Sequence, residues 1–156
     1  MDSAKLVLAL LDEGYEKKTW HGPNLKQSIK GVTAKQAAWR PGPGRHNIWE
    51  VMLHAAYWKY AVRRRLAGEK RGSFALEGSN WFNTAASRGW KDDVRLLVGE
   101  HRKLRAAIAA FPASALGRPV DAKKQTAAYT IRGIAAHDLY HAGQIQLLKK
   151  LLIPNS

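Results

Sequence analysis

The sequence predicts an all-α protein, a four-helix bundle formed by one domain that covers residues 1–156. Apolar residues recur at steps of three and four in four long segments, and no segment has the two-residue alternation of a strand. A chain of 156 residues is also long enough to bury a core without disulfides, and it contains no cysteine. We therefore expect four long amphipathic helices that pack together, with short extra helices in the connections.

The first helix is predicted over residues 3–20, with Leu6, Leu10, Tyr15 and Lys18 at helical spacing and with Leu8 and Leu11 widening the apolar stripe. It should end at the glycine–proline pair at 22–23, because glycine terminates helices and proline cannot continue them. The apolar run near its start has no basic leader, so we interpret it as a helix and not as a signal peptide.

Two short helices are predicted next, one over residues 24–31 and one opened by the capping box at 33–36. A loop rich in proline and glycine follows at 40–44. The second long helix is predicted from Asn47, another capping residue, to residue 66 or 67.

A polar, glycine-rich connection at 68–89 is long for a compact domain, and such segments often serve as lids or binding loops. Phe74, Trp81 and Phe82 are expected to anchor it to the bundle. The third long helix is predicted over 90–111. Connections of this length allow a crossed topology in place of a simple up-down-up-down order.

The last helix is predicted over residues 131–150, after an irregular link at 113–129. Thr130 is the expected N-cap, and Lys149 and Lys150 suit the C-terminal end of the helix dipole.

The chain carries 26 lysines and arginines against 12 acidic residues, a formal charge of +14. This charge favours nucleic acid, an anionic membrane surface or an acidic small molecule as partner, although a solvated basic surface explains it equally well. No apolar run reaches the roughly 18 residues that a membrane span needs. We expect a cytoplasmic protein that does not enter membranes.

His137 and His141 interrupt the apolar stripe of the last helix, and their spacing places them on one face about 6 Å apart. Two inward imidazoles need partners, which can be hydrogen-bonding side chains or one shared metal ion. His54 lies beside the stripe of the second helix and supplies a third imidazole if the two helices are neighbours. Three histidines leave positions open for water or substrate, as in catalytic metal sites. The H-E-x-x-H pattern of zinc peptidases is absent, since residues 138 and 140 are aspartate and tyrosine.

Other residues are candidates for the surroundings of this site. His101 lies in the stripe of the third helix and can be a fourth ligand, a pocket residue or a structural histidine. Gln144 follows His141 by one turn and can orient it, although an exposed glutamine is the commoner case. Tyr57 and Trp58 on the second helix are further candidates for the pocket.

Trp81 and Trp90 can wall a pocket as Trp58 can, but we interpret all three as core residues. His21 and His46 lie at loop–helix junctions, and His46 is interpreted as a turn residue.

Three stretches carry a resemblance to a known family, namely WHGPN at 20–24, HNIWEVMLHAAYWKY at 46–60 and TIRGIAAHDLYHAGQ at 130–144. They resemble the DinB family of four-helix-bundle proteins, and the resemblance covers nearly the whole chain. The family motif, one histidine on the second helix and H-x-x-x-H on the fourth, matches His54, His137 and His141.

This resemblance implies a divalent metal ion, commonly nickel or zinc, on those three histidines, with water completing the coordination, and it implies frequent homodimers. Family members of known activity are low-molecular-weight-thiol transferases or thiol-dependent isomerases, others are described as metal-dependent hydrolases, and many have no assigned activity. The resemblance therefore specifies the site more closely than the reaction.

The leading functional hypothesis is a metal-dependent enzyme that activates a small-molecule thiol, or water, and acts on a small, acidic substrate. A second hypothesis is a nucleic-acid-binding module that places a set of basic residues on phosphates, namely Lys59, Arg63, Arg64, Arg65 and Arg71. A third is a non-catalytic bundle stabilised by a metal ion whose ligand shell is closed.

Overall fold

The computed structural model describes residues 3–72, 74–84 and 88–152. Within these residues the regular structure is helical, apart from one isolated antiparallel bridge between Pro119 and Thr126. The elements in chain order are α1 (Ser3–Tyr15), α2 (Leu25–Ile29), α3 (Ala34–Ala38), α4 (Ile48–Leu66), α5 (Trp90–Ala109), the 3₁₀-helix η2 (Ala113–Ala115) and α6 (Ala127–Leu152). The predicted all-α fold is confirmed.

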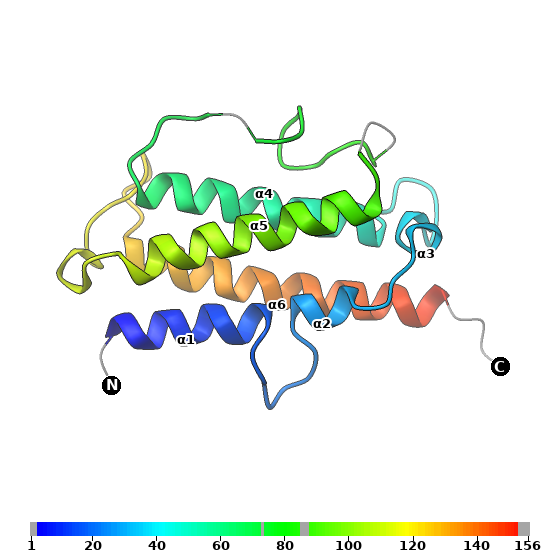
Figure 1. Cartoon of the computed structure of the whole chain (residues 1–156), viewed down its shortest axis with the longest axis horizontal. Coiled ribbons are helices and arrows are strands. Elements are labelled where there is room, and N and C mark those ends of the chain that lie inside the picture. Colours follow the sequence, from blue (N-terminus) through cyan, green and yellow to red (C-terminus); the bar gives the residue numbers. More distant parts are fainter. Residues whose placement is uncertain (1–2, 73, 85–87, 153–156) are drawn as a thin grey trace.

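The four long helices form a bundle in which α4 and α5 run in one direction and α1 and α6 run in the other (Figure 1). Helix α6 packs against α1 and α4, and α5 packs against α4. Because α4 and α5 are parallel, the chain between them returns along the length of the bundle, which is the crossed topology that the long connections allow (Figure 1).

The predicted apolar stripe of α1 is correct at Leu11 and Tyr15 and wrong at Leu6 and Leu10. Leu6 and Leu10 are 48% and 38% exposed, whereas Val7, Leu11 and Tyr15 are buried. Apolar residues occupy adjacent positions in this helix, so the spacing alone fits either of two neighbouring faces.

Helix α1 also ends at Tyr15, five residues before the predicted end. The chain turns away because Asn24, which caps α2 by accepting from Gln27 N at 3.0 Å, also donates its amide to the Lys17 carbonyl at 2.8 Å. The two predicted capping boxes, which begin at Thr33 and Asn47, are both present.

Helix α6 begins at Ala127, four residues earlier than predicted. Thr130 is therefore inside the helix and not at its N-cap, and its hydroxyl donates to the Thr126 carbonyl at 3.0 Å. Thr126 takes the expected role, because its hydroxyl oxygen accepts from Tyr129 N at 3.2 Å.

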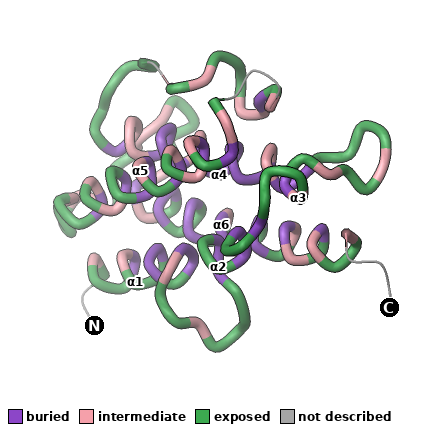
Figure 2. Tube along the Cα trace, turned by 45° about the vertical axis from the view of Figure 1, so that its right-hand side comes forward, coloured by how far each residue is buried: buried purple, intermediate pink, exposed green. Residues whose placement is uncertain are grey.

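Buried residues line the facing sides of the helices, and the connections are largely exposed (Figure 2). The core consists of two apolar clusters, one that includes Met52 and Ile145 and one that includes Leu66 and Ile131. Lys59 on α4 and Asp138 and His141 on α6 lie between the residues of these two clusters, so the middle of the bundle contains a polar layer, and His54 lies beside it.

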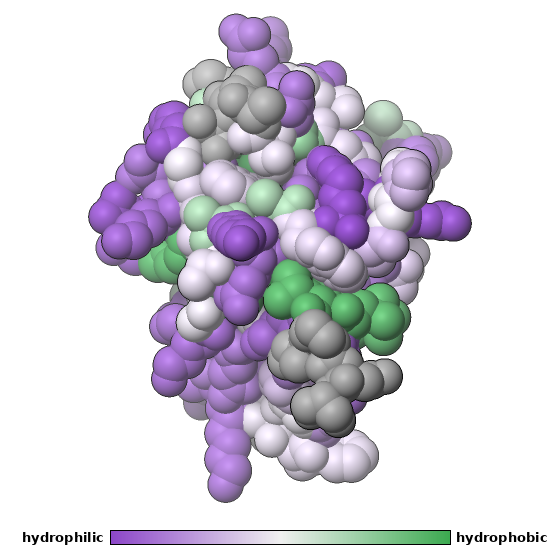
Figure 3. All heavy atoms as spheres, turned by 90° about the vertical axis from the view of Figure 1, so that its right-hand side faces the viewer, coloured by the Kyte–Doolittle hydropathy of each residue, from purple (hydrophilic) through white to green (hydrophobic). Residues whose placement is uncertain are grey.

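The end of the bundle where α6 terminates has a largely hydrophilic surface that includes a strongly apolar patch below its centre (Figure 3). Leu147 and Leu151 are exposed large apolar residues in the last turns of α6. Among the described residues, no helix has the length and apolar character needed to cross a membrane.

Candidate metal centre

The polar layer brings the three predicted histidines together. His54 comes from α4, and His137 and His141 come from successive turns of α6. The Nε2 atom of His137 lies 3.3 Å from Nε2 of His54 and 3.0 Å from Nε2 of His141. One nitrogen from each ring lies within 4.8 Å of the other two, so a single ion can contact all three.

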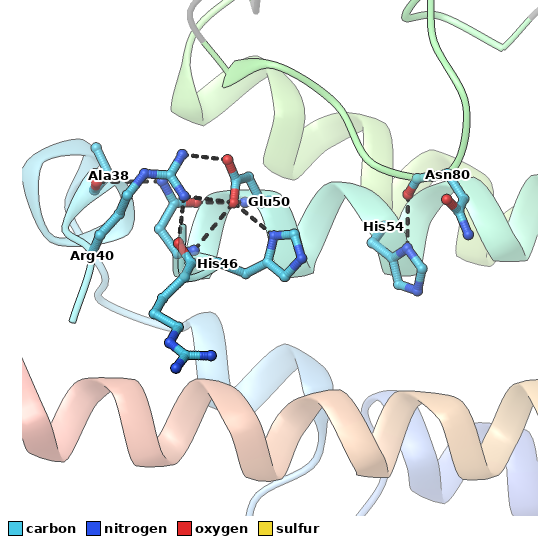
Figure 4. A network of polar contacts seen from close by, with 8 residues as sticks. Ala38, Arg40, His46, Glu50, His54 and Asn80 are labelled. Atoms are coloured by element: carbon cyan, nitrogen blue, oxygen red, sulfur yellow. Dashed lines mark hydrogen bonds and ion pairs between the residues drawn. The ribbon is translucent and has the colours of Figure 1, made fainter. Parts of the chain in front are cut away.

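Hydrogen bonds on the outer side of the cluster fix which nitrogen faces inward. The Nδ1 atom of His54 donates to the Asn80 carbonyl at 2.7 Å, from the segment between α4 and α5 (Figure 4). His141 Nδ1 lies 2.7 Å from the Gln144 side-chain oxygen, to which it donates. A neutral imidazole that donates from Nδ1 has a lone pair on Nε2. The inward Nε2 atoms of His54 and His141 are therefore electron-pair donors directed at the Nε2 atom of His137, an arrangement that a shared cation stabilises.

The surroundings keep these imidazoles neutral. Burial lowers the pKa of His54 to about 4 and that of His137 to about 3. Burial also lowers the pKa of His141, against the opposing effect of its hydrogen bond to Gln144. Neutral imidazole is the form that binds metal, so the site is in its ligating state at neutral pH.

Aromatic and polar side chains hold the cluster on its α4 side. The Trp81 ring stacks on His54 with centroids 4.0 Å apart and on His46 at 3.7 Å. Glu50 accepts from His46 Nδ1 at 2.9 Å and also binds Arg40 (Figure 4). Trp81 is thus a wall of the site and not core filler, and His46, predicted as a turn residue, supports that wall.

The three histidines open into a cavity of about 570 Å³. Its apolar walls come from five residues, Pro41, Val51, Trp81, Leu147 and Leu148, and its remaining polar lining from Arg45, His46, Tyr140 and Gln144. A larger cavity of about 1280 Å³ lies between α1, α2 and the start of α5, and none of its described lining residues is a histidine. The smaller cavity is therefore the candidate active site.

The family model of the DinB superfamily matches residues 19–145 of the chain. This chain belongs to the DinB superfamily. No curated protein and no solved structure matched it. Proteins of the DinB type bind metal, and the three-histidine cluster of this DinB chain can hold a metal ion.

His101 does not join the cluster in this DinB protein. It stacks on Tyr15 with centroids 3.6 Å apart, and its Nδ1 lies 3.3 Å from Nζ of Lys59. Lys59 is fully buried and forms an ion pair with Asp138, which is also fully buried. Burial lowers the pKa of His101 to about 3, with a further contribution from the Lys59 charge. His101 therefore belongs to a separate buried ion-pair cluster.

The buried ion pair corrects one detail of the nucleic-acid hypothesis. Lys59 was predicted to contact phosphates, but its side chain has no solvent exposure. Arg63 and Arg65 form ion pairs with Glu69 and Asp121, so part of the predicted basic cluster is neutralised by neighbouring acids.

The remaining predicted pocket residues lie in different places in the DinB chain. Gln144 contacts His141 as expected, and Trp58 meets the rings of His54 and His137 edge-on at 6.3 Å each. Tyr57 instead faces the Phe74 and Phe82 anchors and does not line the cavity. Trp90 is a core residue, as interpreted, and donates to the Val32 carbonyl at 2.8 Å.

Proposed function

We propose that this DinB protein is a metal-dependent enzyme in which His54, His137 and His141 bind one divalent ion. In this proposal the thiol of a small molecule, or water, is activated at that position and attacks an electrophilic substrate. The main support is the orientation of three neutral imidazoles, whose inward nitrogens converge at the base of an open cavity.

The ligand set supports a catalytic role over a structural one. No carboxylate or fourth histidine of the described residues joins the cluster, so the protein supplies three ligands and leaves coordination positions for substrate. Imidazole ligands suit zinc and nickel among the divalent metals. When bound, such an ion supplies Lewis acidity that lowers the pKa of a coordinated thiol or water.

The side chains around the histidines have separable roles. The Asn80 carbonyl and Gln144 hold the rings of His54 and His141 in their ligating orientation. Trp81 covers one face of His54 and limits the access of water from that side. The chain has no cysteine, so a reacting thiol has to come from a small molecule.

The test measures the rate of conjugation between a small thiol and 1-chloro-2,4-dinitrobenzene, and the hydrolysis of p-nitrophenyl acetate, with zinc- or nickel-loaded protein. His137→Ala removes the central imidazole of the cluster. The rate in whichever assay shows activity should fall by about 100-fold or more, because His54 and His141 alone hold the ion poorly. His21→Ala changes an exposed histidine outside the cluster and should leave the rate unchanged. Equal rates for wild type and His137→Ala in both assays would remove the enzymatic proposal.

A further inference from the structure

Arg45 differs from the other basic residues near the metal centre. It lines the same cavity as the three histidines, and its side chain forms no hydrogen bond or ion pair with any described residue. Its neighbours Arg40 and His46 both bind Glu50, which accepts from each of them. Glu50 therefore already pairs with these two residues, and the positive charge of Arg45 has no acidic partner among the described residues of the cavity.

The backbone holds Arg45 in place although its side chain is free. Arg45 N donates to the Gly42 carbonyl at 3.2 Å, and the Arg45 carbonyl accepts from the Arg40 guanidinium at 2.6 Å. Gly44 has φ +68, a conformation that glycine adopts without strain, and it closes this turn. The guanidinium therefore extends from a fixed point at the start of α4, the helix that carries His54.

The composition of the cavity selects for a particular ligand charge. No aspartate or glutamate is among its described lining residues, and its other basic side chains are histidines. Arg45 is then the one permanently charged side chain of that lining. A single guanidinium matches a single carboxylate, which it can bind through two parallel hydrogen bonds. The apolar walls, such as Val51 and Leu148, suit a hydrocarbon portion between the carboxylate and the reacting group.

We propose that the ligand of this site is a small, mainly apolar molecule with one carboxylate, and that Arg45 binds this carboxylate while the reacting group lies at the histidines. This inference rests on the proposed function, because it takes the histidine cluster as the reacting end of the cavity. It makes Arg45 a determinant of substrate specificity.

The experiment uses cobalt(II)-loaded protein, in which a thiolate bound to the metal produces a charge-transfer absorption band. Two matched thiols, 3-mercaptopropionate and its methyl ester, are titrated, and the ratio of their dissociation constants is measured. The same comparison is made by calorimetry with butanoate and butanamide, which lack a thiol. Wild type, Arg45→Gln and the control Arg132→Gln are compared; Arg132 is an exposed arginine on α6 that does not line the cavity.

Wild type should bind the acid about tenfold or more tightly than the ester, as expected for one charge-assisted bidentate contact. Arg45→Gln should bring this ratio close to one with little change in the affinity for the ester, and Arg132→Gln should keep the wild-type ratio. A ratio that is the same in wild type and Arg45→Gln, or an acid bound no better than its ester, would overturn the proposal.

The two pairs of probes separate this inference from the proposed function. If no thiolate band develops with either thiol, thiol activation is wrong. A preference for butanoate that disappears in Arg45→Gln then still supports Arg45 as the carboxylate-binding residue, and the absence of that preference rejects it.

Discussion

The Nδ1 hydrogen bonds of His54 and His141 determine which nitrogen these two rings present to the cavity. His54 relies on a backbone carbonyl, that of Asn80, which no side-chain substitution removes. His141 relies on the side chain of Gln144, so a substitution of Gln144 can remove the contact that orients the His141 ring. Such outer contacts raise ligand basicity and hold the ring in place.

Gln144→Met keeps the length of this side chain and removes its oxygen acceptor. We expect the affinity for zinc to fall by about 10- to 100-fold, because His141 loses the contact that fixes its tautomer. Calorimetric titration of the metal-free protein measures this change, and circular dichroism checks that the helical content is retained. An unchanged affinity would show that Gln144 does not orient the ligand.

At the scale of elements, the pairing of α4 with α6 decides whether the histidines meet. Lys59 lies five residues after His54 on α4, and its partner Asp138 directly follows His137 on α6. The buried ion pair therefore fixes the register of the two helices within about one turn of the metal centre. Burial raises the pKa of Asp138 to about 6 against the opposing effect of Lys59, which keeps the carboxylate ionised at neutral pH.

Lys59→Met leaves the Asp138 carboxylate buried without its partner, and it should lower the free energy of unfolding by about 3–5 kcal/mol. The double variant Lys59→Met/Asp138→Leu removes both charges and should recover much of this loss. Urea denaturation of the metal-free proteins measures both values. A double variant that is less stable than Lys59→Met would contradict the pairing.

Helices α1 and α6 approach closely at Gly14, where an added Cβ would lie 2.8 Å from the Ala135 carbonyl oxygen. Gly14→Ala should therefore destabilise the protein by about 1–3 kcal/mol, because two backbones would have to separate. Gly99→Ala on α5 has open space around its added methyl and should stabilise by up to about 1 kcal/mol through helix propensity. Thermal unfolding of the two variants gives the comparison, and shifts of the same sign would refute the close packing.

The sequence was sufficient for the helical segments and for the pair His137 and His141, because both depend on regular spacing along a helix. His54 is added to this pair through the motif of the family that the chain resembles. It was insufficient where a contact crosses between elements. The acceptor for His54 is the Asn80 backbone in a long connection, and a backbone carbonyl has no residue-type signal. Nothing in the sequence around Lys59 indicates that its side chain is buried, because its partner Asp138 is 79 positions away along the chain.

At the scale of the whole molecule, the buried histidines couple stability to pH. Burial lowers the pKa of His54, His101 and His137 to between about 3 and about 4. An unfolded histidine has a pKa near about 6.5, so below that pH the unfolded chain binds more protons than the folded chain. Asp138 acts in the opposite sense, because its raised pKa favours proton uptake by the folded state between about pH 4 and about pH 6.

The histidines outnumber this one carboxylate, so the metal-free protein should lose stability steadily as the pH falls from about 6.5 towards about 4. Urea midpoints measured at half-unit intervals of pH test this trend. His101→Phe, which replaces one of these histidines by an apolar ring, should flatten the slope. A midpoint that rises on acidification over this range would show that the histidines are not buried in neutral form.

The central claim is that His54, His137 and His141 hold one divalent ion with a coordination position left open. X-ray absorption spectroscopy of the purified, metal-loaded protein, combined with metal analysis, tests it most directly. We predict one ion per chain, three imidazole nitrogens in its shell and at least one further oxygen ligand from solvent. The absence of a stoichiometric ion, or a shell in which imidazole nitrogens do not number three, would contradict the account.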